Sequence, residues 1–174
     1  SDSGHVRIYK NVNNTWTKVG GDIDGEAAGD NSGVSVSLSG DGSIVAIGTC
    51  LNDGNETASG HVRIFKNIND TWTKVGGDIY GEAAYDFSGW AVSLSSDGSV
   101  VAIGAEGNDG NGNNSGHVRI YKNVNNSWSQ IGSDIDGEAT DDLSGWSVSL
   151  SSDGSVVAIG AYGNDGNGTD SGHV

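Results

Sequence analysis

The segment Ser-Gly-His-Val-Arg-Ile-Tyr-Lys at residues 3–10 returns along the chain at a fixed interval. It recurs at 59–66, with Phe in place of Tyr, and again at 115–122, and its first four residues return at 171–174. Each recurrence begins 56 residues after the one before it. A fixed period of this kind marks supersecondary units that bury their apolar faces by stacking on their neighbours. We therefore expect one array of three repeats.

Composition narrows the class of protein. The 174 residues include 30 glycines and no proline, and 34% are hydrophobic, which is typical of short strands joined by tight turns. Eight Lys and Arg against 23 Asp and Glu leave a net charge of −15, which opposes binding to nucleic acid or to anionic lipid. No apolar run approaches the roughly 18 residues of a membrane span, so we expect no membrane insertion. The start lacks Met and any signal-like pattern, which favours a mature product or an internal excerpt.

Each repeat contains four short β-like runs separated by turn residues. In the second copy these runs are 61–66, 71–76, 89–95 and 99–104, and no helical period competes with them. Asp-Gly lies between the last two runs, and it is a strong hairpin signal because both residues accept positive φ. We therefore expect these two runs to pair in every copy. The three Asp-Gly pairs are Asp41-Gly42, Asp97-Gly98 and Asp153-Gly154.

The last run of the repeat, at 100–103, is apolar on both faces, whereas Trp90, Val92 and Leu94 alternate with small residues. A strand that other sheets cover on both sides needs such a sequence, with small side chains where neighbouring sheets approach closely. The pattern predicts an all-β fold of four-stranded antiparallel blades in tandem, of the β-propeller type.

Three segments resemble the successive strands of FG-GAP repeats, which build the propeller of integrin α subunits and of many secreted or cell-surface proteins. They are Ser-Gly-Trp-Ser-Val-Ser-Leu at 144–150, Val-Val-Ala-Ile-Gly-Ala at 156–161 and Ser-Gly-His-Val-Arg-Ile-Tyr at 115–121. The family's calcium loop lies between the first two strands of a blade, and here that connection has shrunk to the Asp-Gly turn. The family's metal residues are therefore not carried over to this chain.

The FG-GAP strand order divides the chain into two complete blades between two partial ones. Residues 31–86 and 87–142 form the complete blades. Residues 1–30 supply the third and fourth strands of a split blade, and residues 143–174 supply the first and second strands of another, together with the start of the next strand. We treat residues 1–174 as one repeat array.

The split blades need partners. Propellers typically close with about four to eight blades, so three blades are too few for a ring. Residues 171–174 also duplicate 3–6, and in a self-closed ring the two segments would compete for one strand position. Three assemblies remain open: a six-bladed ring of two chains, part of a longer array, or an open superhelix in which blades pass from chain to chain. In each, neighbouring chains or further repeats complete the split blades by strand sharing.

Six Asn-x-Ser/Thr sequons predict N-glycans and hence an extracellular, secreted or cell-surface location. Three of them occupy the same turn before a Trp-containing strand in each copy, which is a repeated and exposed placement. The alternative is that an Asn-rich chain produces sequons by chance and that duplication copies them. The six residues are Asn13, Asn55, Asn69, Asn113, Asn125 and Asn167.

Two acidic clusters offer the closely spaced oxygen ligands that calcium prefers. Their members are Asp22, Asp24, Glu26 and Asp30 in the first copy and Asp134, Asp136, Glu138 and Asp142 in the third. In the second copy Tyr80 replaces the middle carboxylate, which favours the alternative that these acids fix an inter-blade loop by accepting backbone N–H bonds. Calcium is therefore an optional cofactor, and no cofactor is required. The loop at 108–114 superficially resembles a calcium loop, but it lacks the terminal bidentate Glu of an EF-hand.

Catalysis finds little support in the remaining residues. Four histidines recur at strand starts, where packing a blade edge is a simpler role than acting as equivalent bases. They are His5, His61, His117 and His173. Cys50 stands alone and has no internal disulfide partner, which leaves an incidental thiol or a bridge to another chain. The tryptophans at 16, 72 and 128 share one strand slot and those at 90 and 146 share another, so we expect blade-packing anchors, with stacking on sugars as the alternative.

These observations predict a non-enzymatic extracellular structural repeat protein that assembles with itself, blade to blade, into a filament or surface coat. The first alternative is an adhesion or ligand-binding propeller of the integrin kind, dependent on calcium. The second is a carbohydrate-active enzyme, which would need two paired carboxylates in one asymmetric site. Nearly identical repeats favour assembly over either alternative, because a binding or catalytic site usually breaks the symmetry with one divergent loop.

Overall fold

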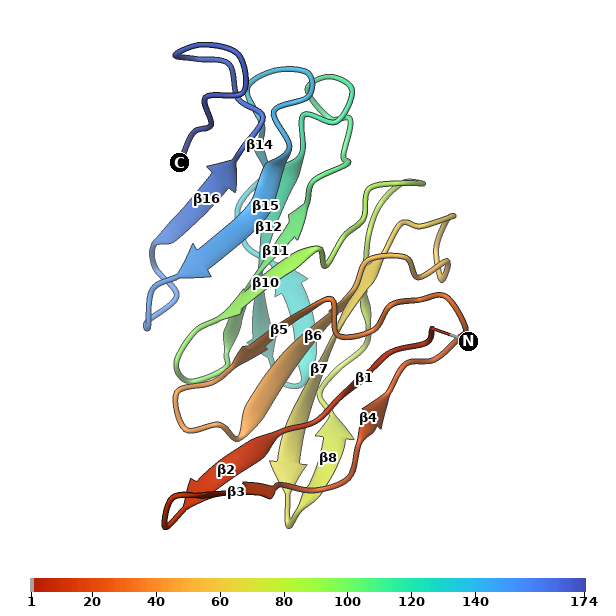
Figure 1. Ribbon diagram of the computed structural model, residues 1–174, viewed down its shortest axis with the longest axis vertical. Helices are drawn as coiled ribbons and strands as arrows, with labels where there is room; N and C mark the ends of the chain where they lie inside the picture. The colour runs from red at the N-terminus through yellow and green to blue at the C-terminus, as the bar shows by residue number, and fades with distance from the viewer. Residues whose placement is uncertain (1) are drawn as a thin grey trace.

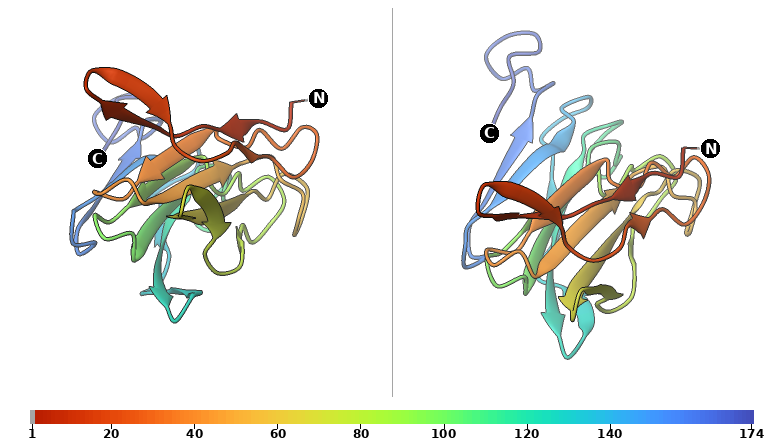
Figure 2. Two further views of the ribbon diagram at one scale, coloured as in Figure 1. Left: turned by 90° about the horizontal axis from the view of Figure 1, so that it is seen from below. Right: turned by 60° about the horizontal axis from the view of Figure 1, so that its bottom comes forward.

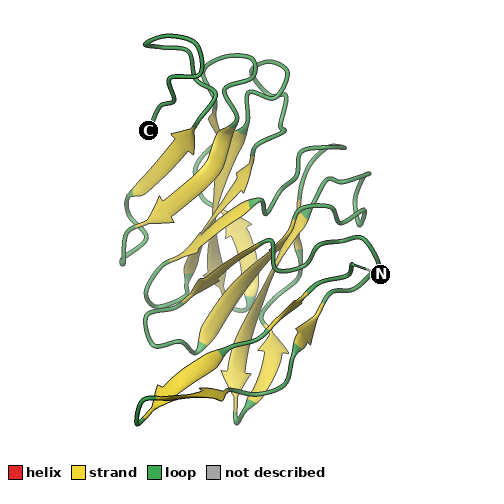
Figure 3. Cartoon of the chain, viewed as in Figure 1, coloured by secondary structure: helices red, strands yellow, loops and turns green. Residues whose placement is uncertain are grey.

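The computed structural model describes residues 2–174, and every regular element in that range is a β-strand (Figure 3). The strands are β1(His5–Val6), β2(Tyr9–Val12), β3(Thr15–Lys18), β4(Ile23–Asp24), β5(Ser35–Leu38), β6(Ile44–Thr49), β7(His61–Ile68), β8(Thr71–Lys74), β9(Ile79–Tyr80), β10(Ala91–Leu94), β11(Val100–Ala105), β12(His117–Val124), β13(Ser127–Gln130), β14(Ile135–Asp136), β15(Ser144–Leu150) and β16(Val157–Ala161). The described residues contain no helix long and apolar enough to span a membrane.

Two sheets of the same topology form the middle of the molecule. Their strand orders are β5-β6-β7-β8 and β10-β11-β12-β13, all pairs being antiparallel. Figure 1 shows these sheets stacked face to face, with the N-terminal strands at one end and β15 and β16 at the other. The stack is open rather than closed into a ring. The predicted all-β architecture of propeller-type blades is confirmed.

A short fifth strand, absent from the prediction, completes each blade. β9 pairs with the first two residues of β7, and β14 pairs with the first two residues of β12. β4 pairs with β1 in the same way, through Ile23 opposite Val6. Two residues are too few to show an alternating pattern, which is why the sequence does not reveal these strands. The fifth strand carries the acidic segment of the repeat back onto the sheet.

The two ends of the array are half-blades. Among the described strands, β2 is paired with β3 at the N-terminus and β15 with β16 at the C-terminus. The segment equivalent to the eight-residue strand β7 is here divided into β1 and β2, and no strand of residues 2–174 lies beside it in the place of β6. The two views in Figure 2 show these N-terminal strands beside the β5–β8 sheet.

Two kinds of hairpin turn recur. The Asp-Gly segment joins the paired strands as expected, but only its glycine has positive φ, for example 70° at Gly98. Asp97 instead accepts hydrogen bonds from the Ser99 backbone N–H (2.9 Å) and the Ser95 hydroxyl (2.7 Å). The two-residue turn with positive φ at both positions is Asn69-Asp70, between β7 and β8, at 51° and 61°. Such a turn matches the right-handed twist of the strands that it joins.

The core lies between successive blades rather than within any one of them. Val45 and Ile47 of β6 pack against Val6 and Ile8 of the N-terminal half-blade. On the other face of the sheet, residues such as Ala46, Val62 and Ile64 pack against the next blade. On the next blade, Ile103 of that second cluster is almost fully buried. Stacking therefore supplies the burial that a single four-stranded sheet lacks.

Candidate functional site

The junction between the two complete blades is built on a glycine. Gly48 of β6 lies against the backbone of the next blade, and a Cβ there would collide with the carbonyl oxygen of Gly89. The Ser35 hydroxyl donates to that same carbonyl at 2.7 Å, and the Ser37 hydroxyl accepts from the Leu94 backbone N–H at 3.0 Å. Polar bonds along the two inner strands therefore fix the register of one blade on the next.

Two of these contacts recur one repeat later, between the second complete blade and the C-terminal half-blade, whereas Ala91 stands in the place of the donor Ser35. A Cβ on Gly104 would collide with the carbonyl oxygen of Gly145, and the Ser93 hydroxyl accepts from the Leu150 N–H at 2.9 Å. Because the second junction reproduces the first, the geometry of the stack is a property of the repeat.

Tryptophan side chains link the outer strands of each blade to the blade before it. The Trp72 indole N–H donates to the carbonyl oxygen of Val19 in the preceding blade at 2.9 Å, and Trp128 donates to Val75 at 2.8 Å. Trp16, which has no preceding blade in the described residues, is mostly exposed. The three tryptophans of this slot thus serve as inter-blade anchors wherever a neighbour is present.

At the N-terminal end, one half of the inter-blade interface is exposed. Val36 and Leu38 of β5 are 53% and 47% exposed, whereas the equivalent residues Val92 and Leu94 are 9% and 7% exposed against the preceding blade. The side chains are the same, so the difference comes from the neighbour alone. The face of β5 therefore exposes the side chains that the equivalent strand β10 buries.

At the C-terminal end, the other half is exposed. Gly160 is the third member of the series that includes Gly48 and Gly104, but a Cβ there would meet only atoms of Ser147 in its own half-blade. The outer edge of β16 has one partner among the described residues, His173, which exchanges two 2.9 Å backbone hydrogen bonds with Ala161. The C-terminal end of the stack thus exposes the kind of face that, within the chain, packs against the next blade.

The acidic residues of the first copy are dispersed among protein donors. Asp22 forms ion pairs with Lys18 and Arg7, and hydrogen bonds from these two side chains lower its pKa to about 2. Asp24 accepts a 2.9 Å bond from Arg63 through its backbone oxygen.

Glu26 lies 3.4 Å from Arg63 of the next blade. Asp30 is buried and accepts from the Asn52 amide at 2.9 Å and from the Ala27 N–H at 3.2 Å. Asp22, Glu26 and Asp30 therefore already have partners within the protein, and calcium binding by this set stays a prediction.

The third copy repeats the arrangement. Asp134 pairs with Arg119, whose guanidinium bonds lower the pKa of Asp134. Asp136 belongs to β14 and is exposed, and Glu138 lies 3.9 Å from His173. Asp142 is buried and accepts from the Ala139 N–H at 2.9 Å and the Asn164 amide at 3.0 Å. The predicted calcium ligands again lie apart, on inter-blade loops that their hydrogen bonds hold in place.

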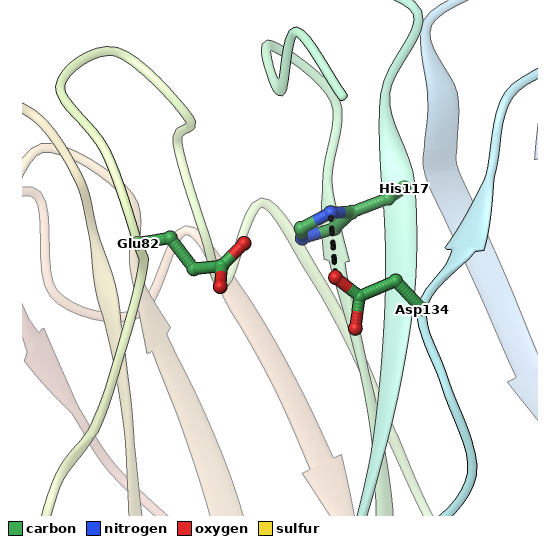
Figure 4. A group of neighbouring side chains, drawn as sticks. All are labelled: Glu82, His117 and Asp134. Carbon is green, nitrogen blue, oxygen red and sulfur yellow. Dashed lines mark ion pairs between the residues drawn. The ribbon is translucent and has the colours of Figure 1, made fainter. Parts of the chain in front are cut away.

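One other group of potential metal ligands comes together in residues 2–174. Glu82, His117 and Asp134 each offer a ligand atom within 4.8 Å of the others (Figure 4). The Arg119 guanidinium pairs with both Glu82 and Asp134, and thus supplies the positive charge that a metal would bring. Arg63 and Glu26 make the equivalent pair one blade earlier. This Arg–Glu clamp between blades was not predicted, because its members are 37 or more residues apart in the sequence.

Burial shifts the pKa values of several groups near the junctions. His61 is fully buried with no partner on either ring nitrogen, its ring contacts Tyr80 edge-on, and burial lowers its pKa. Burial raises the pKa of the Cys50 thiol to about 11, and that of Glu106, in the equivalent slot, to about 7. A buried thiol with a raised pKa is poorly placed for a bridge to another chain.

The loop at 108–114 is closed by its own polar groups. Asn108 accepts from the Gly110 N–H at 2.8 Å and donates to Asp86 at 3.2 Å, and Asp109 accepts from the Asn114 N–H at 2.8 Å. These bonds account for the Asn-Asp-Gly pattern as structural turn chemistry. All six sequon asparagines are exposed, and Asn13, Asn69 and Asn125 each occupy the first position of the two-residue hairpin turn. Their glycosylation stays a prediction.

Comparison with known sequences identifies the repeat. Residues 23–65, 81–121 and 133–174 match the sequence model of a family described as FG-GAP repeat. A search of curated proteins found no match.

Comparison with solved structures gives the fold alone. A protein from Bacteroides fragilis described as a 6-phosphogluconolactonase is similar over 78% of this chain, with 17% identity and a TM-score of 0.55. Hydrazine synthase of Kuenenia stuttgartiensis is similar over 75% of this chain, with 15% identity and a TM-score of 0.48. This chain spans 34% and 29% of those two chains.

Proposed function

Because the chain belongs to the FG-GAP repeat family, we propose that it is a non-enzymatic structural repeat protein that assembles head to tail, blade on blade, into an extracellular filament or surface coat. The observation that carries the proposal is that the two ends of the stack expose the two complementary halves of its own internal junction. A contact between unlike surfaces that does not close on itself generates an open filament.

The proposed partner is a second copy of this chain. Its exposed Val36 and Leu38 would cover the β15–β16 face of the first copy, as Val92 and Leu94 cover the β5–β8 sheet. Its half-blade β1–β4 would complete the sheet begun by β15 and β16. The partner's residues 3–6 would then take the strand position now started by residues 171–174, which have the same sequence.

An extracellular location is supported by the family, whose repeats typically occur in secreted or surface proteins, and by the six exposed sequons. The buried carboxylates of Asp30, Asp86 and Asp142 accept hydrogen bonds from neighbouring loops, and this supports a structural role for them.

Sedimentation velocity across a range of protein concentrations tests the assembly. The wild-type chain should form oligomers that grow with concentration, and deleting residues 171–174 should strengthen this assembly because the competing strand is removed. Gly160→Ala should remain folded and monomeric, since its new Cβ meets only Ser147 within the chain but would collide with a docked blade.

Gly77→Ala is the matched control, because no atom lies within 4 Å of a Cβ at that position, and it should assemble normally. If both the wild-type chain and the truncated chain stay monomeric at every concentration, or if Gly160→Ala assembles like wild type, the proposal is wrong.

A further inference from the structure

An open groove separates the outer strands of the N-terminal half-blade from those of the next blade. It has a volume of about 480 Å³, and its walls include the aromatic rings of Phe65 and Trp72. Its lining residues do not include Val36, Leu38 or Gly160, on which the proposed assembly and its test depend, so binding in the groove can be tested separately from assembly.

The same groove recurs one repeat later, with different walls. The second groove is lined at equivalent positions by Tyr121 and Trp128, but its volume is about 260 Å³. Tyr80 stands there where the first groove has Asp24, and Asn126 stands where the first has Asp70. The second junction is flanked by complete sheets, so the groove belongs to the repeat and does not result from an absent strand. The first groove is thus the larger copy, within the range of volumes of ligand sites.

Two carboxylates that line the first groove have no partners. Among the described residues, the carboxylates of Asp24 and Asp70 make no hydrogen bond or ion pair. Arg63 also lines the groove but is only 5% exposed: its guanidinium donates to the Asp24 backbone oxygen and the Ser32 hydroxyl and pairs with Glu26, and its Nε is buried without a partner. The groove therefore offers two free carboxylates beside an aromatic wall.

The aromatic wall is rigid. The Trp72 indole is held by its 2.9 Å bond to Val19, and the Arg63 guanidinium stacks 5.5 Å above the Phe65 ring. Flat, immobile rings of this kind pack against ligand surfaces at a small entropic cost. The apolar C–H face of a sugar ring is such a surface.

We propose that this groove binds a neutral carbohydrate, which stacks on Trp72 and donates hydroxyl hydrogen bonds to Asp24 and Asp70. Sugar hydroxyls both donate and accept, so they match the carboxylates and the Thr71 hydroxyl together. An anion would be repelled by the unpaired carboxylates and by the net charge of −15. An organic cation would face the positive charge of Arg63 in the groove wall.

The sugar has two sources. It can belong to an external glycan, or to a glycan on Asn69, because the sequon of that residue includes Asp70 and Thr71 of the groove wall. Protein from a bacterial host, which carries no N-glycan, has a free groove for external sugar. If the glycan on Asn69 is the ligand, protein from a glycosylating host should not bind external sugar in the groove. The variant Asn69→Gln from the same host should then bind it.

The test is NMR titration of the Trp72 indole N–H in bacterially produced protein. The probes are methyl glycosides of glucose, galactose, mannose and N-acetylglucosamine, together with cellobiose and lactose, each up to 50 mM. At least one should shift the Trp72 signal saturably while the Trp128 signal of the second groove moves less. Lysine methyl ester and gluconate are the cationic and anionic comparison probes.

Two variants place the residues of the second groove in the first, so the fold already tolerates them. Asp24→Tyr and Asp70→Asn should each weaken sugar binding at least tenfold, whereas Gly77→Ala should not change it. The proposal is overturned if no sugar of the panel shifts the signal, if both variants bind as wild type, or if lysine methyl ester binds in place of the sugars. These outcomes leave the assembly test untouched.

Discussion

The complete blades and the half-blades carry the same sequence pattern, yet they differ in what they bury. Leu94 of β10 and Leu38 of β5 are equivalent residues, but the first is 7% exposed and the second 47% exposed. His61 is fully buried in a complete blade, whereas its equivalents His5 and His173 are exposed in half-blades. The neighbouring blade therefore determines whether a given position of the repeat is buried or exposed.

The largest effect on stability should come from truncating the buried Leu94 rather than its exposed equivalent Leu38. Leu94→Ala removes a buried side chain from the junction and should lower the free energy of unfolding by about 3 kcal/mol. Leu38→Ala, the matched change at the open end, should cost less than about 1 kcal/mol at concentrations where the chain is monomeric. Urea unfolding followed by tryptophan fluorescence measures both. Equal losses would show that β5 is covered in solution by some other contact.

A smaller effect on stability is expected at the repeat position that Cys50, Glu106 and Tyr162 occupy in the three copies. Burial raises the pKa of Glu106 to about 7, so its contribution to stability is complete below the unfolded-state pKa and is lost as pH rises through 7. Glu106→Gln should therefore stabilise the chain by about 2 kcal/mol at pH 8 and by almost nothing at pH 4. Thermal melts at the two pH values test this, and a gain that is the same at both would contradict it.

The smallest effect concerns the buried histidine. The pKa of His61 is lowered first by burial and then by the charge of Arg63, against the opposing carboxylates of Asp78, Glu26 and Asp30. Its contribution to stability is therefore present above the unfolded-state pKa of about 6.5 and is lost as pH falls below it.

The wild-type chain should therefore lose stability relative to His61→Phe as pH falls from 7 to 5, while Glu106 acts in the opposite direction in both proteins. His5→Phe, at the exposed equivalent, should leave the slope unchanged. A slope that is identical in all three proteins would remove His61 as its source.

Much of the fold could be predicted from residues whose signal is local. The 56-residue period, the Asp-Gly segments and the run at 100–103, apolar on both faces, together indicated stacked blades, and the family comparison and the structure confirm them. The turn chemistry was predicted less well. Positive φ at two successive positions occurs in Asn69-Asp70, while Asp97 instead acts as a hydrogen-bond acceptor.

The candidate sites were harder to predict because their partners are distant in sequence. Asp22 and Glu26 read as metal ligands when only their own segment is considered, but Arg7 and Arg63 reach them from other strands. The groove is similarly invisible in sequence, since Asp24 and Trp72 meet only when two blades stack. The sequence does show that Tyr80 replaces Asp24 in the second repeat. Only the structure shows that this position lines a groove.

The most direct test of the central claim, that the two ends of the stack are halves of one interface, is disulfide cross-linking. Inside the chain, the Ser93 hydroxyl meets the Leu150 N–H, and a docked second copy would place its Leu38 against Ser149 in the same way. A chain with Leu38→Cys and Ser149→Cys, in a Cys50→Ser background, should form a ladder of linked dimers, trimers and longer species under mild oxidation. Adding Gly160→Ala should abolish the ladder. Monomers alone, or a ladder that survives Gly160→Ala, would contradict the account.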